Sequence, residues 1–140
     1  MALVGTGAGR PVRPGNWRDV HLDLSAPSTI RELMERERPT AVFYCAYDKS
    51  DPTITVDGAV AAARASYTAG ARFVLFSSDL VFDGRTGGYS EQSLSAQVSL
   101  YGEMKAEAEA LVQAEHPGSL VIRTSLLVGE SGTMLRPAYE

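Results

Sequence analysis

The stretch that decides the fold is Arg72-Phe73-Val74-Leu75-Phe76-Ser77-Ser78, an apolar run that ends in two hydroxyl side chains. The run from Thr40 to Ala46 has the same continuous apolar character. Such runs are typical of strands buried on both faces of a parallel sheet. Two of them, separated by a helical pattern, predict an α/β fold with parallel strands and right-handed crossovers.

Helical patterns alternate with the predicted strands. Ser25 and Ser99 are predicted N-caps, because a serine hydroxyl accepts a hydrogen bond from the first turn of a helix. Asp51-Pro52 predicts another helix start, with the aspartate as cap and the proline as first residue. The expected strands are 2–4, 20–24, 40–46, 72–76 and 120–124, and the expected helices are 25–38, 51–70 and 99–115. The alternation predicts one domain over residues 1–140.

The bulk composition is that of an ordinary globular protein and excludes some function classes. Hydrophobic residues make up 44% of the chain and charged residues 21%, and the formal net charge of −4 argues against a nucleic-acid partner. No apolar run is long enough for a membrane span, and the N-terminal residues lack a signal peptide pattern. The single cysteine, Cys45, fits a reducing cytoplasm, and we expect it to be a small buried strand residue. No spacing of ligands predicts a metal site.

Tyr101 and Lys105 form the most informative pair of polar residues. They are four residues apart on a predicted helix, which places them on one face. The chain has six tyrosines and only two lysines, so a chance pairing is uncommon. A nearby ammonium lowers the pKa of a phenol, which then exchanges protons more readily as a general acid or base. The other interpretation is a surface tyrosine beside a solvated lysine, and Ser77-Ser78 at a strand end favours the chemical one.

The motifs together resemble a known family. Ser77-Ser78-Asp79-Leu80-Val81-Phe82-Asp83-Gly84 is followed by Tyr89-Ser90-Glu91 and then by Tyr-Gly-x-x-Lys at 101–105. This order resembles the extended short-chain dehydrogenases/reductases, and within them the dTDP-4-dehydrorhamnose reductase group. Leu22-Asp23-Leu24, the segment 38–42 and the segment 121–125 extend the resemblance over nearly the whole chain.

The resemblance implies a Rossmann-like parallel sheet, NADP or NAD as cofactor, and reduction of a 4-keto sugar nucleotide. By position, Ser78 corresponds to the residue that hydrogen-bonds the substrate carbonyl, Tyr101 to the proton donor, and Lys105 to the lysine that binds the nicotinamide ribose. The implied cofactor-binding residues are Asp23, Leu24, Ala46, Tyr47, Ser77, Tyr101 and Lys105. A homodimer is a further possibility.

The resemblance begins after the family's first strand and glycine-rich turn. In Gly5-Thr6-Gly7-Ala8-Gly9-Arg10 the third glycine of the fingerprint would fall on Arg10, and prolines follow at once. We therefore align residues 2–7 with the family's second strand. Arg10 could then meet a 2′-phosphate, which would favour NADP, or it could be a solvated loop arginine. The family's C-terminal substrate region is also short here.

Without a first strand, the centre of the sheet would have unpaired edges. Residues 2–4 could move into the vacated place, or another chain could pair with the edge. Three interpretations of function therefore stay open. The chain is a sugar-nucleotide reductase, a non-catalytic nucleotide- or protein-binding module that keeps the reductase fold, or a fragment of a longer reading frame without activity of its own.

Overall fold

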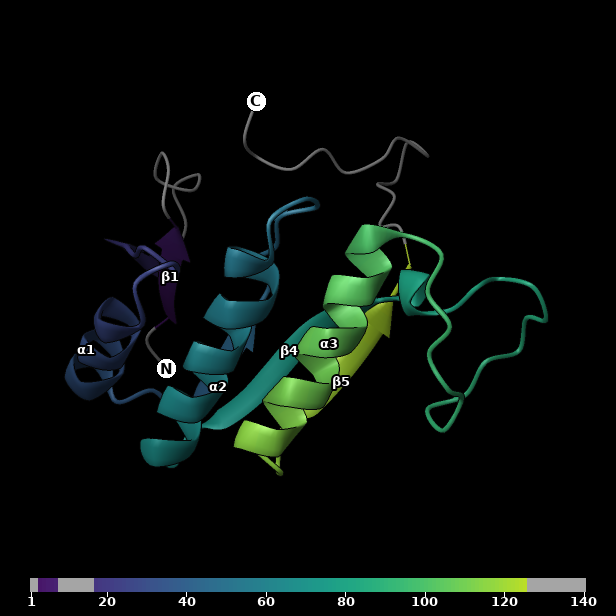
Figure 1. Cartoon of the computed structure of the whole chain (residues 1–140). Helices are drawn as coiled ribbons and strands as arrows, with labels where there is room; N and C mark the ends of the chain where they lie inside the picture. Colours follow the sequence, from purple (N-terminus) through teal and green to yellow (C-terminus); the bar gives the residue numbers. More distant parts are fainter. Residues whose placement is uncertain (1–2, 8–16, 126–140) are drawn as a thin grey trace.

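The computed structural model describes residues 3–7 and 17–125, and its elements alternate as the sequence predicts. In chain order they are β1 (Leu3–Gly7), β2 (Trp17–His21), α1 (Pro27–Glu37), β3 (Ala41–Tyr44), the π-helix η1 (Thr53–Gly58), α2 (Ala59–Thr68), β4 (Arg72–Ser78), the 3-10 turn η2 (Asp79–Val81), α3 (Leu100–Glu115) and β5 (Leu120–Thr124). Figure 1 shows α1, α2 and α3 side by side in front of the strands. The Rossmann-like α/β class is confirmed.

The strands form two parallel sheets rather than the single sheet that we expected. β1 pairs with β2, and the second sheet has the order β3-β4-β5. In the larger sheet Val42 lies opposite Phe73, and Ser78 lies opposite Thr124. Within the described residues no ladder joins β1 to β3, so Leu3 and Val4 have not moved into the vacated place. The chain keeps the parallel connections but interrupts the backbone ladder between the two sheets.

Four strands begin or end at residues other than the predicted ones, and β2 and β4 are the two that bear on the site. β2 ends at His21 instead of continuing to Leu24. The Asp23 carboxylate explains this, because it accepts hydrogen bonds from the backbone N–H and the hydroxyl of Ser25 and turns the chain. β4 continues through Ser78, two residues beyond the predicted end. The two serines are therefore strand residues and not the start of a loop.

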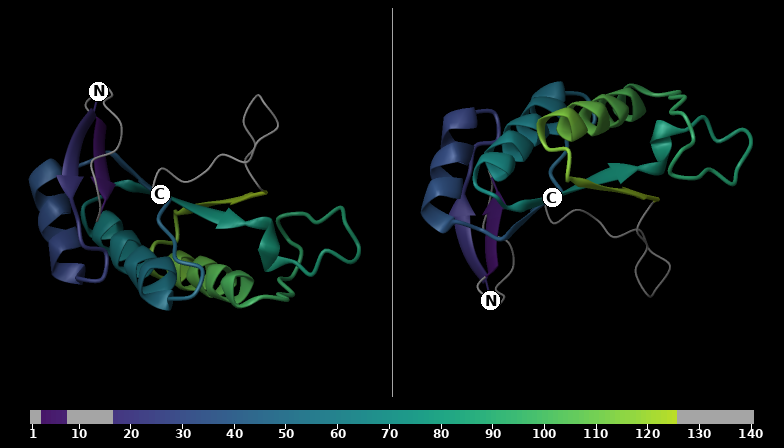
Figure 2. Two further views of the ribbon diagram at one scale, coloured as in Figure 1. Left: turned by 90° about the horizontal axis from the view of Figure 1, so that it is seen from above. Right: turned by 90° about the horizontal axis from the view of Figure 1, so that it is seen from below.

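Helices cover only one face of the larger sheet in the described part of the chain. Figure 2 shows α2 and α3 on the same side of β4 and β5. Side chains alternate along a strand, so Phe73 and Leu75 are buried beneath the helices while Phe43 is 62% exposed and Leu120 is 56% exposed. The expectation that the run 40–46 is buried on both faces is therefore wrong. Hydrophobic continuity could not distinguish a covered face from an open one.

The core lies between the helices and this sheet, and it also reaches the smaller sheet. Small alanines on both α2 and α3 are fully buried, which lets the helices pack closely on the strands. The buried cluster consists of Leu22, Ile30, Tyr44, Val56, Ala59, Ala62, Ala63, Phe73, Leu75, Met104, Ala108 and Val112. Leu22, which follows β2, and Ile30 of α1 belong to this cluster together with residues of β3 and β4, so packing rather than a backbone ladder joins the two parts of the fold.

The helix starts follow the predictions in part. The Ser99 hydroxyl accepts a 3.1 Å hydrogen bond from the backbone N–H of Gly102, which confirms that serine as the cap of α3. Ser25 does not cap α1, because its hydroxyl is bound to Asp23 and Ala26 occupies the cap position. At the second helix the Asp51 carboxylate accepts a hydrogen bond from Thr53, but the chain first forms η1 before α2 begins.

A groove of about 380 Å³ lies between the two sheets. Its apolar lining comes from β1, α1 and β3, and includes Leu3, Ile30, Met34 and Val42. Tyr44 also lines it, and its hydroxyl donates a 2.6 Å hydrogen bond to the carbonyl of Ile54. The groove therefore separates the two sheets at the place where their ladders are interrupted.

We expect Tyr44→Phe to reduce the sensitivity of the fold to alkaline pH. Burial raises the pKa of the Tyr44 hydroxyl, so the folded state favours the protonated phenol. That contribution to stability is complete below the ordinary tyrosine pKa of about 10 and is lost as the pH rises above it. Urea unfolding should show Tyr44→Phe about 1 kcal/mol less stable at pH 8, from the lost hydrogen bond, with a smaller decline above pH 10. The exposed Tyr67, changed to Phe, is the control, and equal alkaline declines in Tyr44→Phe and wild type would contradict this assignment.

Candidate active site

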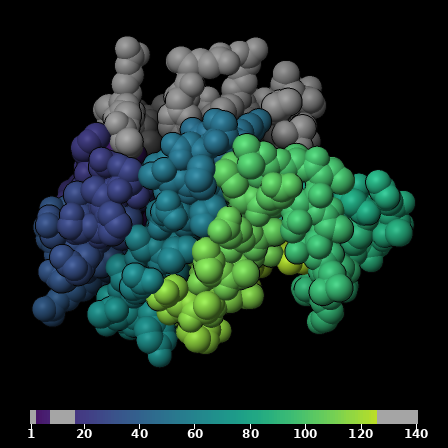
Figure 3. Space-filling model, viewed as in Figure 1, coloured from purple at the N-terminus to yellow at the C-terminus, as the bar shows by residue number. Residues whose placement is uncertain are grey.

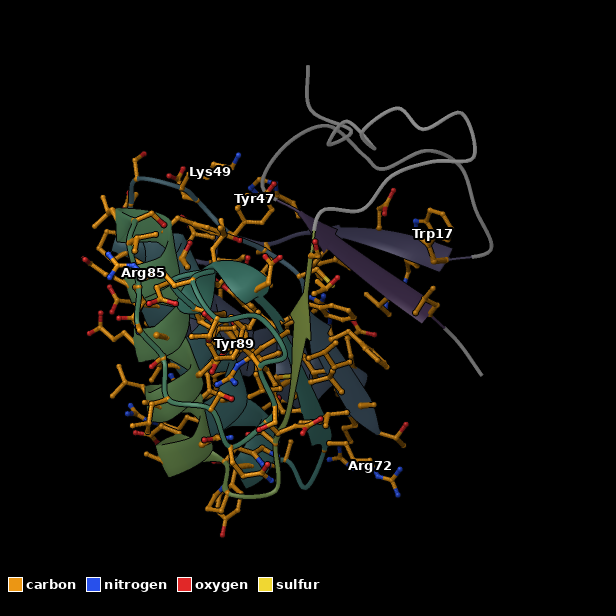
Figure 4. The ribbon with its side chains drawn as sticks, turned by 90° about the vertical axis from the view of Figure 1, so that its right-hand side faces the viewer. Trp17, Tyr47, Lys49, Arg72, Arg85 and Tyr89 are labelled. Carbon is orange, nitrogen blue, oxygen red and sulfur yellow. The ribbon has the colours of Figure 1, made fainter. Side chains whose placement is uncertain are left out.

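The site predicted at the carboxyl ends of the strands is built from β3, β4 and α3. Tyr47 follows the end of β3, Ser77 and Ser78 end β4, and Tyr101 lies in the first turn of α3. Figure 4 shows Tyr47 at one end of the larger sheet and Arg72, the first residue of β4, at the other. The fold therefore brings residues from three segments, distant in sequence, to one edge.

Lys105 is the most constrained polar residue at this edge. It is only 2% exposed, and its ammonium donates a 2.9 Å hydrogen bond to the backbone carbonyl of Phe76. Its Nζ lies 5.8 Å from the ring centre of Tyr47 and 5.8 Å from that of Tyr101. A cation at this distance is attracted by the electron-rich ring faces. The interpretation of the pair as a solvated lysine beside a surface tyrosine is therefore wrong.

Burial rather than the lysine controls the protonation of Tyr101. It raises the pKa of the Tyr101 hydroxyl, and the neighbouring Tyr47 raises it further; the two rings are 5.7 Å apart. Burial also lowers the pKa of Lys105, opposed by Cys45 and Glu109. The expectation that Lys105 lowers the phenol pKa does not hold in this structure. The physical reason is that the phenol is itself partly buried, while the ammonium is directed to the Phe76 carbonyl with its Nζ 5.8 Å from the Tyr101 ring centre.

Ser78 and Ser77 have different surroundings at the end of β4. The Ser78 hydroxyl accepts a 3.2 Å hydrogen bond from the backbone N–H of Leu80 and lies 3.3 Å from a carboxylate oxygen of Asp79. It thereby caps the short turn η2. The Ser77 hydroxyl is buried and has no hydrogen-bond partner among the described residues. A buried hydroxyl without a partner is uncommon in folded proteins.

Gly102 is a site residue that the sequence reasoning missed. A Cβ atom at this position would lie 2.2 Å from the backbone carbonyl oxygen of Leu80, closer than any real contact. The start of α3 therefore rests directly on η2, and only glycine permits this approach. The available signal was a glycine in the first turn of an otherwise good helix, where it costs about 1 kcal/mol relative to alanine.

The remaining predicted cofactor-binding residues do not contact Tyr101 or Lys105 through hydrogen bonds or ion pairs in the described structure. Asp23 and Leu24 follow β2 in the smaller sheet, and in the described segments no hydrogen bond or ion pair links them to Tyr101 or Lys105. Ala46 is half-buried at the end of β3 and packs against the core cluster. Arg10 lies outside the described residues.

Cys45 is exposed, so the prediction of a buried strand cysteine is wrong. The reason is again alternation, because Cys45 follows Tyr44, whose side chain points into the core. Over residues 3–7 and 17–125, no group of three histidine, cysteine or acidic residues could hold a metal ion. In the same residues no helix has the length and apolar character to cross a membrane.

A protein-family model for the RmlD substrate binding domain matches residues 4–137. The chain belongs to this family. The resemblance inferred from Ser78, Tyr101 and Lys105 is thus confirmed at the level of the family. The match does not by itself assign a role to any of these side chains.

The chain is similar both to a subunit of methionine adenosyltransferase and to dTDP-4-dehydrorhamnose reductases. Methionine adenosyltransferase 2 subunit beta from Pongo abelii is 24% identical, over 91% of this chain and 45% of that protein. The dTDP-4-dehydrorhamnose reductase of Aggregatibacter actinomycetemcomitans is 29% identical, over 84% of this chain and 45% of that protein. A crystal structure of the Bacillus anthracis dTDP-4-dehydrorhamnose reductase with NADP is 29% identical, has a TM-score of 0.77, and matches 96% of this chain and 57% of its own. This chain therefore spans less than half of those curated relatives.

Proposed function

We propose that this protein acts in the NAD(P)H-dependent reduction of a 4-keto sugar nucleotide, with Ser78, Tyr101 and Lys105 as its catalytic residues. The observation that carries the proposal is the placement of Lys105. Burial of a lysine is costly, and no carboxylate forms an ion pair with it in the described structure. A buried ammonium held beside a tyrosine at the carboxyl edge of a parallel sheet is more useful for chemistry than for stability.

The residues at this edge fit a nicotinamide cofactor. The Ser77 hydroxyl is buried without a partner, and Lys105 has further donor hydrogens beyond the one bound to Phe76. We propose that Lys105, Tyr47, Ala46 and Ser77 hold the cofactor on this side, together with Asp23 and Leu24 on the other sheet. When bound, NADPH or NADH supplies a hydride to a carbonyl carbon.

In this proposal the Tyr101 hydroxyl is the proton donor. The phenol carries its proton at neutral pH and can give it to a carbonyl oxygen that gains negative charge, although burial raises its pKa and makes it a weaker acid before the ligands bind. The Ser78 hydroxyl would donate a hydrogen bond to the same oxygen, after turning from Asp79. Lys105 would keep Tyr101 in place through the cation–ring contact and add positive charge beside the developing alkoxide.

The first test is calorimetric titration of the chain with NADPH and NADH, using Lys105→Met as the variant. Methionine preserves most of the buried volume but removes the charge and the donor hydrogens. We expect the dissociation constant to rise about 10- to 150-fold, the range for losing a hydrogen bond from a charged group. Lys49→Met is the matched control, because Lys49 is the chain's other lysine and is exposed.

The outcomes separate the interpretations. Binding that is lost in Lys105→Met and kept in Lys49→Met supports the proposed site. Equal binding by both variants would place the cofactor elsewhere. No binding of either nucleotide by the wild-type chain at millimolar concentration would contradict the reductase proposal for this chain.

A second candidate is a binding module without reductase activity. The similarity to proteins named as a subunit of methionine adenosyltransferase, over 91% of this chain, favours it. A module predicts nucleotide binding without turnover of NADPH in the presence of dTDP-4-dehydrorhamnose. A reductase predicts turnover that depends on Tyr101.

A further inference from the structure

The loop 82–98 connects the two halves of the proposed catalytic set. It leaves η2 just after Ser78 and returns to Ser99, the cap of the helix that carries Tyr101. Figure 3 shows it as a lobe beside α3. Loops of this length without helix or strand are uncommon inside a compact domain unless they serve a function. The contacts that fix the conformation of this loop therefore bear on the site.

An aromatic stack closes the loop on itself. The rings of Phe82 and Tyr89 lie parallel, with centres 4.3 Å apart and an angle of 4° between them. The Tyr89 hydroxyl donates a 2.5 Å hydrogen bond to Asp83 and accepts a 3.3 Å hydrogen bond from the backbone of Thr86. Tyr89 is half-buried, whereas Arg85 on the same loop is exposed. The first part of the loop is thus built around Tyr89.

Arg123 ties this stack to the helix. Its guanidinium carbon lies 5.0 Å from the ring centre of Phe82, and its Nη2 donates a 2.7 Å hydrogen bond to Glu109. A second nitrogen, Nε, lies 3.1 and 3.2 Å from the two oxygens of the same carboxylate. The face of the guanidinium therefore contacts the loop while its edge contacts α3. Glu109 lies one helical turn after Lys105, on the same side of the helix.

Stability alone does not account for this ion pair. Glu109 is only 7% exposed, and removing such a carboxylate from water offsets much of the attraction to its partner. An apolar pair of the same size would stabilise the fold as well or better. The planar guanidinium instead orients two groups at once. Its edge binds the Glu109 carboxylate and its face stacks on the Phe82 ring.

We propose that Arg123 is a positioning residue that fixes the loop 82–98 against α3. The loop then forms a wall of fixed shape beside Ser78 and Tyr101, on the side where a sugar nucleotide would enter. Its role in substrate binding rests on the proposed reductase function, whereas the ordering of the loop does not. Arg123, Phe82 and Glu109 act as one unit in this arrangement.

The proposal is tested with Arg123→Lys and Phe82→Leu, which keep the charge and the apolar volume but remove the planar contact. Amide hydrogen exchange over residues 84–98 should become about tenfold faster in each variant, because both lose the contact between the Arg123 guanidinium and the Phe82 ring. The double variant should exchange more slowly than the product of the two single effects predicts, because the two changes share this contact. Arg72→Lys, an exposed arginine at the opposite end of the sheet, is the control and should exchange as wild type.

Kinetics provide the second readout. Arg123→Lys should raise the KM for dTDP-4-dehydrorhamnose about tenfold while leaving the dissociation constant for NADPH unchanged. Unchanged exchange in a folded Arg123→Lys protein would overturn the proposal, as would additive effects in the double variant. If wild type shows no turnover but the loop exchange responds as expected, the reductase proposal fails while the positioning role stands.

Discussion

Gly102→Ala is expected to destabilise the protein and to separate Tyr101 from Ser78. An alanine Cβ would be placed 2.2 Å from the Leu80 carbonyl oxygen, and this oxygen belongs to the backbone, so no side-chain rotation relieves the clash. Either α3 or η2 must move. Overpacking of this kind costs about 1–3 kcal/mol or more, against the gain of about 1 kcal/mol that alanine normally brings to a helix. The free energy of unfolding in urea measures the net effect.

The displacement also has a chemical consequence. The N–H of Leu80 is bound to the Ser78 hydroxyl, so moving the Leu80 peptide moves the serine as well. We expect turnover in Gly102→Ala to fall further than its stability explains. Gly118→Ala is the matched control, because its Cβ would meet its nearest neighbour only at 3.7 Å. An alanine variant at 102 that is more stable than wild type would show that the contact with Leu80 is not tight.

Tyr101→Phe is expected to lower the rate of NADPH-dependent carbonyl reduction by about 10²- to 10⁴-fold, the usual contribution of a positioned general acid. The ring stays, so its packing on Tyr47 and its contact with the Lys105 ammonium are kept. The dissociation constant for NADPH should therefore change little. Single-turnover kinetics with dTDP-4-dehydrorhamnose separate this loss of kcat from a change in KM.

Tyr67→Phe serves as the control for that measurement. Tyr67 is exposed at the end of α2 and packs on His116, away from the proposed site. Both variants lose one phenolic hydroxyl, but only Tyr101→Phe should lose activity. Equal activity in wild type and Tyr101→Phe would assign the proton to another donor. No turnover by either protein, with NADPH binding intact, would favour the binding module.

Much of the fold could be predicted because buried strands and capped helices leave strong local patterns. The cap at Ser99, the last strand and the α/β alternation all depend on residues close in sequence. The interruption between β1 and β3 depends instead on which strands become neighbours in space. The exposure of Phe43 has the same origin, because a run of apolar residues does not indicate how many faces of a sheet are covered.

The candidate site shows the same division. The spacing of Tyr101 and Lys105 correctly predicted that they share a face, but the direction of the pKa shift could not be predicted. That shift depends on how deeply the Tyr101 phenol is buried and on Tyr47, which comes from a segment more than 50 positions earlier in the sequence. The ion pair between Arg123 and Glu109 could not be predicted from the sequence either, because it depends on how β5 packs against α3.

The interrupted ladder between the two sheets has a consequence for the way the molecule comes apart. Backbone ladders transmit cooperativity along a sheet, whereas side-chain packing permits parts of a protein to open separately. Within the described residues no strand ladder joins the unit formed by β1, β2 and α1 to the remainder, and the contact is made by packing of α1 on α2 and by the apolar cluster around Leu22 and Ile30. We therefore expect this unit to open before the three-stranded sheet does, and Asp23 and Leu24 would leave with it. Tyr101 and Lys105 stay behind on the more robust part.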